Sequence, residues 1–257
     1  MHPTSSFVGP LLTDYYQLSM AYAYWKSNRH ESHAVFDLFF RKNPFEGEFT
    51  VFAGLEEAVR FVSAFRFSQA DLEYVRSLMP ACDPAYFEWL ASIDCSRVRI
   101  HAIREGTVVF PRIPLLIVEG PLAICQLLET TLLTLVNYAS LVTTNAARFR
   151  IAAGADKTLL EFGLRRAQGP DGGVSASRYS YIGGFDATSN VLAGKLFGVP
   201  VRGTHAHAFV TAFTDLDALE THTISDAQGK TVDFVGLVRQ CREELGFTRT
   251  NEGELAS

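Results

Sequence analysis

Two histidines that follow a short apolar stretch are the first candidates for chemistry in this sequence. The segment Gly203-Thr204-His205-Ala206-His207 comes directly after Val199-Pro200-Val201. β-Branched residues followed by a glycine are typical of a buried strand that ends in a turn. Ligands of α/β proteins bind at the carboxyl ends of strands, so Thr204 and His207 are candidates to meet a substrate. Hydrogen-bonded loop histidines without a catalytic role are the alternative.

A second candidate group follows another predicted strand, Thr158 to Phe162. Phe162 ends that strand, and Arg165 and Arg166 come shortly after it. Two arginines suit bidentate binding of a carboxylate or a phosphate, and a phenylalanine suits stacking on a flat ring. The alternative is that Phe162 belongs to the core and that the arginines pair with Glu161 or with surface acids. The two strand ends are expected to be neighbours in a parallel sheet, and taken together the two groups describe a site for an anionic, aromatic ligand.

Three other features bear on the chemistry. Asp186 follows two glycines and is either a carboxylate of the site or the N-cap of a helix. His205 and His207 are also spaced as a zinc pair, with His222 as a further downstream histidine, which would make the protein a zinc hydrolase. The sequence has no P-loop motif and no dinucleotide-binding glycine motif.

The composition indicates a folded protein rather than a disordered or nucleic-acid-binding one. Of the 257 residues, 47% are hydrophobic and 20% are charged, and the formal net charge is −5. Such a chain buries a sizeable core, and its acidic balance offers no electrostatic footprint for nucleic acid or for an anionic membrane. We therefore expect local basic residues to hold any phosphate.

Three features favour a soluble, cytoplasmic protein. The cysteines Cys82, Cys95, Cys125 and Cys241 form no C-x-x-C pair and are expected to be reduced. The N-terminus has no basic segment followed by an apolar one, so no signal peptide is expected. The longest charge-free window, Thr130 to Ala147, contains too many threonines and asparagines for a membrane span.

The first part of the chain alternates between strand and helix patterns, which predicts an α+β sandwich domain over residues 1–120. The expected helices are Leu11–Asn28, Leu55–Ala64, Asp71–Met79 and Ala85–Ala91. The expected strands are His33–Arg41, Phe49–Ala53, Val98–Ile103, Val108–Phe110 and Leu115–Val118.

Residues 121–257 are predicted to form a second domain. It begins with a buried helix from Leu122 to about Ala153 and continues with a β-α rhythm that predicts a parallel sheet, open or closed into a barrel. The expected elements are a strand Thr158–Phe162, a glycine-rich loop Gly169–Gly173, a helix Phe185–Phe197, a strand Val199–Val201 and a helix Val232–Leu245.

The end of the chain predicts an incomplete domain. Asn251 and Glu254 resemble a capped helix start without a helix after it. Two predicted strands do not close a sheet, so we expect a fragment or a shortened form.

Three motifs resemble nicotinate phosphoribosyltransferase, a type II phosphoribosyltransferase, in the order in which that family has them. They are Leu11–Gln17 (LLTDYYQ), Glu161–Gly169 (EFGLRRAQG) and Gly203–His207 (GTHAH), supported by Pro170–Gly173 and Ser189–Gly194. The resemblance covers essentially the whole chain and implies the N-terminal half of a member. The implied fold is α/β, with an N-terminal α+β sandwich domain followed by the first part of an irregular α/β barrel, incomplete at the C-terminus.

The resemblance implies an enzyme of NAD biosynthesis that forms nicotinate mononucleotide and pyrophosphate from nicotinate and 5-phosphoribosyl 1-pyrophosphate. ATP is the implied co-substrate, Mg²⁺ accompanies the pyrophosphate, and the implied assembly is a homodimer with shared sites. By position, His207 corresponds to the histidine that ATP phosphorylates, and Thr204 to a residue that contacts nicotinate. Tyr16 corresponds to the tyrosine that stacks on the pyridine ring in the partner's site.

Three more positions correspond to substrate-binding residues of the related nicotinamide enzymes. Phe162 falls at a second stacking aromatic, Arg165 at a substrate-binding arginine and Asp186 at a substrate-contacting aspartate. Because a full-length member also supplies the rest of the barrel, we expect this chain alone to have little or no activity. The alternative function is a catalytically incomplete isoform that acts only by dimerisation.

Overall fold

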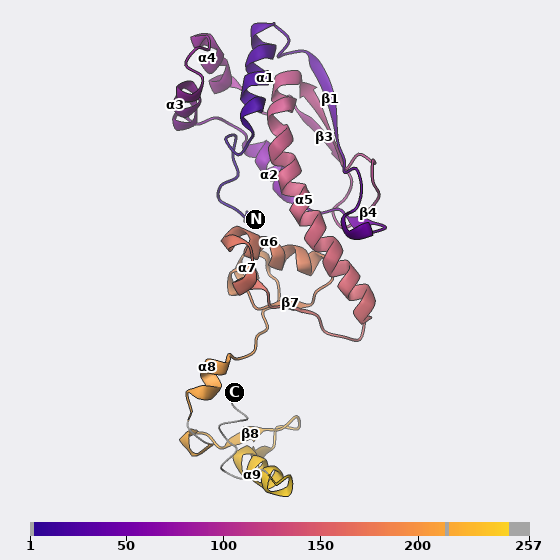
Figure 1. Cartoon of the computed structure of the whole chain (residues 1–257), viewed down its shortest axis with the longest axis vertical. Helices are drawn as coiled ribbons and strands as arrows, with labels where there is room; N and C mark the ends of the chain where they lie inside the picture. The colour runs from indigo at the N-terminus through magenta and orange to yellow at the C-terminus, as the bar shows by residue number, and fades with distance from the viewer. Residues whose placement is uncertain (1–2, 214–215, 247–257) are drawn as a thin grey trace. The chain divides into compact units, whose positions relative to one another are not determined.

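The computed structural model describes residues 3–213 and 216–246 and divides into two compact units, Met1–Arg202 and Gly203–Ser257 (Figure 1). The helices of the first unit are α1 (Tyr15–Lys26), α2 (Leu55–Ala64), α3 (Gln69–Leu78), α4 (Pro84–Ser92), α5 (Leu122–Ala153), α6 (Gly169–Ile182) and α7 (Val191–Phe197). Its strands are β1 (His33–Leu38), β2 (Thr50–Val51), β3 (Arg99–Ala102), β4 (Val108–Val109), β5 (Leu116–Pro121), β6 (Leu160–Glu161) and β7 (Ala187–Thr188). The predicted mixture of helices and strands is confirmed, and the predicted domain boundary at residue 120 stays a prediction.

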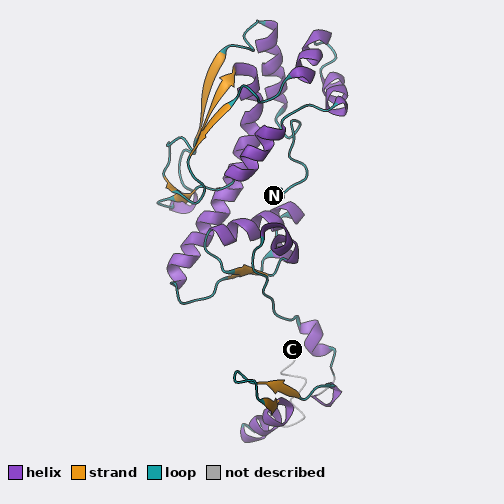
Figure 2. Ribbon diagram, turned by 180° about the vertical axis from the view of Figure 1, so that it is seen from behind, coloured by secondary structure: helices purple, strands orange, loops and turns teal. Residues whose placement is uncertain are grey.

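A three-stranded antiparallel sheet forms one layer of the first unit. β5 lies in the middle, with β1 and β3 on its two sides, and Val118 pairs with both Phe36 and Ile100. Alternate residues of β1 are exposed, as expected for a strand with one face toward the core and one toward solvent. Figure 2 shows the helices gathered on one side of this sheet. One face of the sheet therefore packs against the helices, and the other face is exposed to solvent.

The hydrophobic core lies between the sheet and helices α1 to α5. Its largest fully buried side chains include Tyr86, Phe52 and Phe65. Local signals set the helix ends: Ser68 and Asp71 form a capping box at the start of α3, and the Asp83 side chain caps α4. The predicted helix from Leu11 is shorter than expected at its start, because the chain before Tyr15 is turned.

Helix α5 begins and ends where the sequence predicts. It contacts both parts of the first unit, namely the sheet and helices that precede it and the segment from β6 to α7 that follows it. It lies along α1 and the sheet and then reaches α6 (Figure 1). Two side-chain hydroxyls of α5 also accept hydrogen bonds from backbone amides in and after β2, where a neighbouring strand would otherwise provide the acceptors. Thr144 Oγ1 accepts a hydrogen bond from the Val51 amide at 2.9 Å, and Ser140 Oγ accepts from the Ala53 amide at 3.0 Å. The predicted strand Phe49–Ala53 is therefore confined to Thr50 and Val51, which pair with β4.

By length and composition alone, α5 would be able to cross a membrane. In this chain, 56% of its most apolar window is buried within the protein. A helix that is apolar on most sides is also what the core of a large globular domain requires. One such helix is weak evidence for a membrane span.

The part of the first unit after α5 corrects two predictions. The expected loop Gly169–Gly173 is the first turn of α6, because Pro170 fits the first turn of a helix, where its missing amide leaves no hydrogen bond unmade. The expected helix Phe185–Phe197 contains β7 before α7. β7 pairs in parallel with β6, and Thr188 also forms a parallel bridge with Val201. Tertiary pairing of a fully buried Thr188 overrides the helical pattern here.

The second unit contains α8 (His207–Thr211), the 3₁₀ turn η3 (Leu216–Ala218), β8 (Thr223–Ser225), β9 (Thr231–Asp233) and α9 (Phe234–Glu244). α9 confirms the predicted C-terminal helix. The hairpin of β8 and β9 is not predicted, although Asp226 and Gly229 mark its turn, with Gly229 at φ +79°. The expected helix start at Asn251 lies outside the described residues.

Gly183, which directly follows α6, and Gly172 within α6 give a test of the packing of this helix against α5. A Cβ on Gly183 would lie 2.5 Å from both the Ala146 Cβ and the Thr143 carbonyl oxygen, whereas a Cβ on Gly172 would meet only the Gln168 Cβ at 3.9 Å. Gly183→Ala should lower the free energy of unfolding by about 1–3 kcal/mol through overpacking. Gly172→Ala should raise it by about 0.5–1 kcal/mol. Urea unfolding measures both, and equal effects of the two substitutions would contradict this packing.

The cysteines should differ strongly in reactivity. Burial raises the pKa of Cys95 to about 12 and that of Cys125 to about 11, whereas Cys241 is exposed. Burial also raises the pKa of the half-buried Cys82. Because the thiolate is the reactive form, Cys241 should be the one thiol of the folded chain that reacts rapidly with Ellman's reagent near pH ~8. Cys241→Ser should remove this fast phase, and a fast phase that persists in the variant would show that a buried thiol is accessible.

Candidate functional site

The two candidate strand ends are not adjacent in the sheet. β7 lies between β6 and Val201, because β6 pairs with β7 and Thr188 of β7 bridges to Val201. The Arg202 amide continues this pairing with a hydrogen bond to the Thr188 carbonyl at 3.0 Å. The prediction of parallel strands is confirmed. The prediction that the strand ends are neighbours is wrong, because β7 was predicted as part of a helix.

Phe162, Arg165 and Arg166 follow the carboxyl end of β6, as predicted. Phe162 is half-buried, and the two arginines are exposed on the 3₁₀ turn η2 (Leu164–Arg166). In the described part of the chain neither arginine forms an ion pair, and the Glu161 side chain is buried and bonds to Ser177 and Thr188 instead. The structure therefore brings a half-buried ring and two available cations together at one strand end, which is chemically suited to a flat anion.

A buried hydrogen-bond network supports this strand end, and sequence patterns did not reveal it. Glu161 accepts hydrogen bonds from the Thr188 hydroxyl at 2.6 Å, the Ser177 hydroxyl at 2.8 Å and the Gly163 amide at 2.5 Å. The Asn190 side-chain amide donates to Ser177 at 3.1 Å. Both carboxylate oxygens of Glu161 are thus used, which fixes the turn that carries Arg165 relative to β7 and α6. The signal in the sequence was a glutamate inside an apolar strand.

Asp186 lies at the amino end of the parallel strands, whereas Phe162 lies at their carboxyl end. It precedes β7, and its Oδ2 accepts hydrogen bonds from the Leu159 amide at 2.7 Å and from Arg150 at 2.5 Å. Arg150 also donates to the carbonyl oxygens of Gly184, Gly154 and Lys157. Asp186 is therefore not a helix N-cap, and one of its carboxylate oxygens is engaged in holding the loop between α5 and β6.

Tyr16 lies on α1, with its ring exposed. The side chain is 45% exposed, and its hydroxyl donates to Glu129 of α5 at 3.3 Å. The neighbouring Tyr15 is 58% exposed, so neither tyrosine belongs to the core. Gln17 is buried instead, and it accepts a hydrogen bond from Gln126 at 2.6 Å. The hydrogen bonds of Tyr16 to Glu129 and of Gln126 to Gln17 thus hold α1 on α5 in an orientation that leaves the Tyr16 ring exposed.

Thr204, His205 and His207 belong to the second unit, which is described by itself. All three are exposed, and His207 is the first residue of α8. The His205 ring lies 5.9 Å from the Phe209 ring. Over residues 3–213 and 216–246, no three His, Cys, Asp or Glu side chains come together as a possible metal site, so the structure gives the zinc alternative no support.

Asp186 offers a pH-dependent test of its contacts. The Leu159 amide and then the Arg150 guanidinium hold the pKa of Asp186 below its ordinary value of 3.8. The ionised carboxylate therefore stabilises the fold above the unfolded-state pKa, and this contribution is lost as the pH falls through the lower folded-state pKa. NMR titration should give a pKa below 3.8 that rises in Arg150→Gln, and Asp186→Asn should destabilise the chain more at neutral than at acidic pH. An unshifted carboxyl would contradict these contacts.

Comparisons with known proteins agree on one family. The model of the nicotinate phosphoribosyltransferase N-terminal domain matches residues 11–137. Nicotinate phosphoribosyltransferase of Dictyostelium discoideum is 56% identical over 255 residues, which are 99% of this chain and 43% of that protein. The Homo sapiens protein of the same name is 56% identical over 257 aligned residues, covering 96% of this chain and 48% of that protein.

A solved structure gives the same result. The crystal structure of human nicotinic acid phosphoribosyltransferase matches with a TM-score of 0.78 and 53% identity, over 91% of this chain and 48% of that one. The chain thus spans about half the length of the curated relatives it matches. The family model covers the motif that carries Tyr16 and ends at residue 137, whereas the Dictyostelium discoideum relative matches over 99% of the chain and so includes the strand ends described above. On these grounds, the chain belongs to the nicotinate phosphoribosyltransferase family and corresponds to the N-terminal half of its members.

Proposed function

We propose that this chain supplies the N-terminal part of a nicotinate phosphoribosyltransferase, which forms nicotinate mononucleotide and pyrophosphate from nicotinate and 5-phosphoribosyl 1-pyrophosphate. The observation that carries the proposal is 56% identity over 99% of the chain to a relative of that name. Named relatives of this kind do not favour the alternative of an isoform that acts only by dimerisation.

The described geometry supports a share in binding nicotinate. Nicotinate is a flat ring with one carboxylate, so an exposed arginine suits the carboxylate and an aromatic face suits the ring. Arg165 would bind the carboxylate, and Phe162 would stack on the ring from the end of β6. Tyr16 has its ring exposed and would stack on a pyridine ring in the site of a partner subunit, in a homodimer. Thr204 would contact nicotinate from the second unit.

Asp186 has a more limited role in the proposal. Its Oδ2 is held by Leu159 and Arg150, so only the other carboxylate oxygen remains to contact a substrate. Its position at the amino end of β7 also separates it from Arg165 within the sheet. Of the proposed substrate-binding residues, Asp186 is therefore the one for which the geometry gives least support.

His207 would take a phosphoryl group from ATP. A neutral imidazole nitrogen is a nucleophile, and later hydrolysis of the phosphohistidine would couple ATP to product formation. His207 is exposed at the start of α8, so ATP is able to reach it. His205 has no proposed role, and its ring lies tilted against that of Phe209.

Mg²⁺ would enter as part of the pyrophosphate substrate. Among residues 3–213 and 216–246, no group of three carboxylates or histidines forms a site for a resident metal. Both carboxylate oxygens of Glu161 are engaged by hydroxyl and amide donors, and Asp186, with one oxygen held by Arg150 and Leu159, is part of no such group in the described residues. The residues described here therefore do not fit a protein-bound Mg²⁺, and we assign it no step on this chain.

The architecture and the location complete the proposal. β6, β7 and Val201 run parallel and are joined through α6 and α7, as the first strands of an irregular α/β barrel would be. The layer of β1, β5 and β3 with its helices would be the N-terminal sandwich domain. We place the protein in the cytoplasm.

Product formation from labelled nicotinate tests the proposed function. The assay contains phosphoribosyl pyrophosphate, Mg²⁺ and ATP, and it compares this chain alone with this chain joined to the C-terminal half of the human relative. The joined protein should form nicotinate mononucleotide, whereas the chain alone should form little or none. His207→Ala in the joined protein should reduce the ATP-dependent rate by about tenfold or more.

His205→Ala is the matched control, because it removes a neighbouring exposed histidine without a proposed role. It should leave the ATP-dependent rate close to that of the unmodified protein. Equal losses in the two variants would contradict the assignment to His207. A folded joined protein that makes no product would contradict the function itself.

A further inference from the structure

Glu161 is a buried carboxylate at the end of β6, shortly before the turn η2. The residue is 9% exposed, and its three hydrogen-bond donors are one backbone amide and two hydroxyls. Oε1 accepts from the Gly163 amide, and Oε2 accepts from both Ser177 and Thr188. A buried carboxylate is costly unless its hydrogen-bonding capacity is used, so these three bonds strongly favour one arrangement of the groups that donate them.

Asn190 closes this network into a ring at Oε2. Its backbone amide donates to the Thr188 hydroxyl at 3.0 Å, and its side-chain amide donates to the Ser177 hydroxyl at 3.1 Å. Each hydroxyl then donates to Glu161, so two hydrogen-bonded paths run from Asn190 to the same oxygen atom. Ser177, Thr188 and Asn190 are all buried. Helix α6, strand β7 and the start of α7 therefore meet at Glu161 and hold its carboxylate in one orientation.

The other carboxylate oxygen, Oε1, contacts the chain that leads into the turn. The Gly163 amide donates to it at 2.5 Å, and the Gly163 carbonyl in turn accepts from the Arg166 amide at 2.8 Å. Gly163 directly precedes η2, and Arg165 is the middle residue of that turn. A change in the orientation of the Glu161 carboxylate would therefore rotate the start of η2 and move Arg165 relative to Phe162.

We propose that Glu161 is a positioning residue for nicotinate, which acts through the turn that presents Arg165. This role rests on the proposed function, in which Arg165 binds the carboxylate and Phe162 stacks on the ring, and it adds the group that sets the distance between them. A carboxylate offers only acceptors, whereas the amide of a glutamine turns an N–H₂ group toward at least one of the three donors. Glu161→Gln therefore breaks one or more of the contacts while it keeps the size of the side chain.

Steady-state kinetics of Glu161→Gln tests the proposal, in this chain joined to the C-terminal half of the human relative. The KM for nicotinate should rise about tenfold, because a misplaced guanidinium loses part of a charge-assisted contact, whereas kcat and the KM for phosphoribosyl pyrophosphate should stay within about twofold. Ser177→Ala removes one donor, and Gly163→Ala adds a Cβ 3.0 Å from Oε1, so both should raise the same KM. They carry the test if Glu161→Gln does not fold. A fall in kcat without a change in the KM for nicotinate would overturn the proposal.

A double-mutant cycle shows whether Glu161 acts through Arg165. In Arg165→Gln no guanidinium is left to position, so adding Glu161→Gln should change the KM for nicotinate by less than about twofold. Effects of the two substitutions that add in full would show that Glu161 acts on a different part of the site, and this result would also overturn the proposal.

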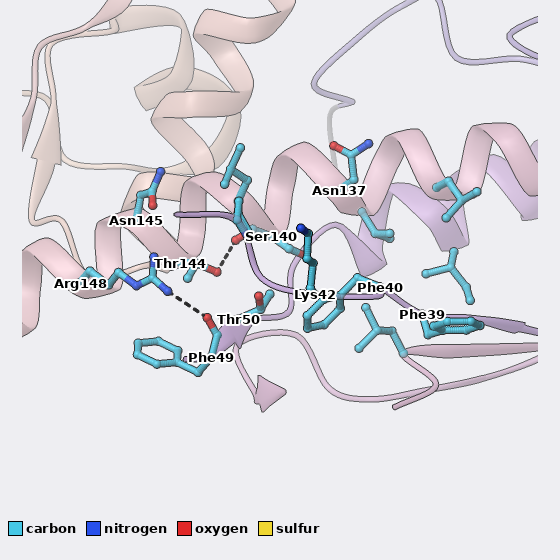
Figure 3. Close-up of a pocket in the computed structure, with 16 residues that line it drawn as sticks. Phe39, Phe40, Lys42, Phe49, Thr50, Asn137, Ser140, Thr144, Asn145 and Arg148 are labelled. Atoms are coloured by element: carbon cyan, nitrogen blue, oxygen red, sulfur yellow. Dashed lines mark hydrogen bonds between the residues drawn. The ribbon is translucent and has the colours of Figure 1, made fainter. Parts of the chain in front are cut away.

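Ser140→Ala is the matched control for Ser177→Ala, since both substitutions remove a buried hydroxyl from a helix. Ser140 lies on α5 beside Thr144 (Figure 3), and its hydroxyl bonds to the backbone of Ala53 and not to the strand end. Its loss should lower the stability of the chain and leave the KM for nicotinate unchanged. An equal rise in this KM in the two variants would show general loosening of the fold and contradict a positioning role.

Hydrogen exchange of the 257-residue chain gives a readout that needs no activity. Glu161→Gln should speed the exchange of the Gly163 and Arg166 amides by roughly tenfold, because the turn loses its support, and should leave the amides of α5 unchanged. Unchanged exchange at both amides would overturn the proposal. If the unmodified joined protein folds and makes no product, the proposed function is wrong, and the exchange of these two amides then decides by itself whether Glu161 orders the turn.

Discussion

The packing of α5 against both parts of the first unit is the constraint on which the rest of the structure depends. Apolar burial supplies most of the stabilisation, but it is not directional and does not fix how far one element slides along another. Hydrogen bonds are directional, and three side chains along α5 make hydrogen bonds that fix the neighbouring segments. Thr131 bonds to the Leu12 carbonyl, Ser140 to Ala53 and Thr143 to the Tyr179 carbonyl. One helix therefore sets the positions of α1, β2 and α6 together.

A buried ion pair provides a second link between the two parts. Arg178 of α6 is 7% exposed and bonds to Glu57 of α2 at 2.8 Å and to Glu56. Burial raises the pKa of Glu57, and the nearby Arg60 and Arg178 oppose that shift. A buried pair of this kind specifies a geometry more than it adds net stability. Together with Glu161, it fixes α6 and hence the strand end that carries Phe162 and Arg165.

Sequence patterns were most informative where one physical signal dominates. The apolar pattern from Leu122 to about Ala153 predicts α5, and the helix spans Leu122–Ala153, because nothing within the pattern breaks a helix. Patterns failed where tertiary pairing decides. Ala187 and Thr188 are strand residues only because β6 and Val201 lie on both sides of them. Pro170 next to several glycines predicts a loop, yet a proline in the first turn of a helix is favourable, and α6 begins there.

The candidate site shows the same limits. The position of Phe162 and Arg165 at a strand end was predictable, because it follows from local order along the chain. The partners of Asp186 were not, because Arg150 is distant in sequence and donates to several carbonyl oxygens that no pattern marks. The resemblance supplied the roles of Tyr16, Thr204 and His207, since exposed side chains carry little local pattern of their own.

The central claim is that this chain contributes separate residues to a site shared between subunits. Complementation tests it most directly, with Tyr16→Ala and His207→Ala placed in separate copies of this chain joined to the C-terminal half of the human relative. Mixed and allowed to exchange subunits, the two inactive variants should recover about a quarter of the unmodified rate, since half of random dimers are mixed and each has one intact site. If the mixture stays as inactive as either variant alone although mixed dimers form, Tyr16 and His207 do not serve the shared site, and the claim is wrong.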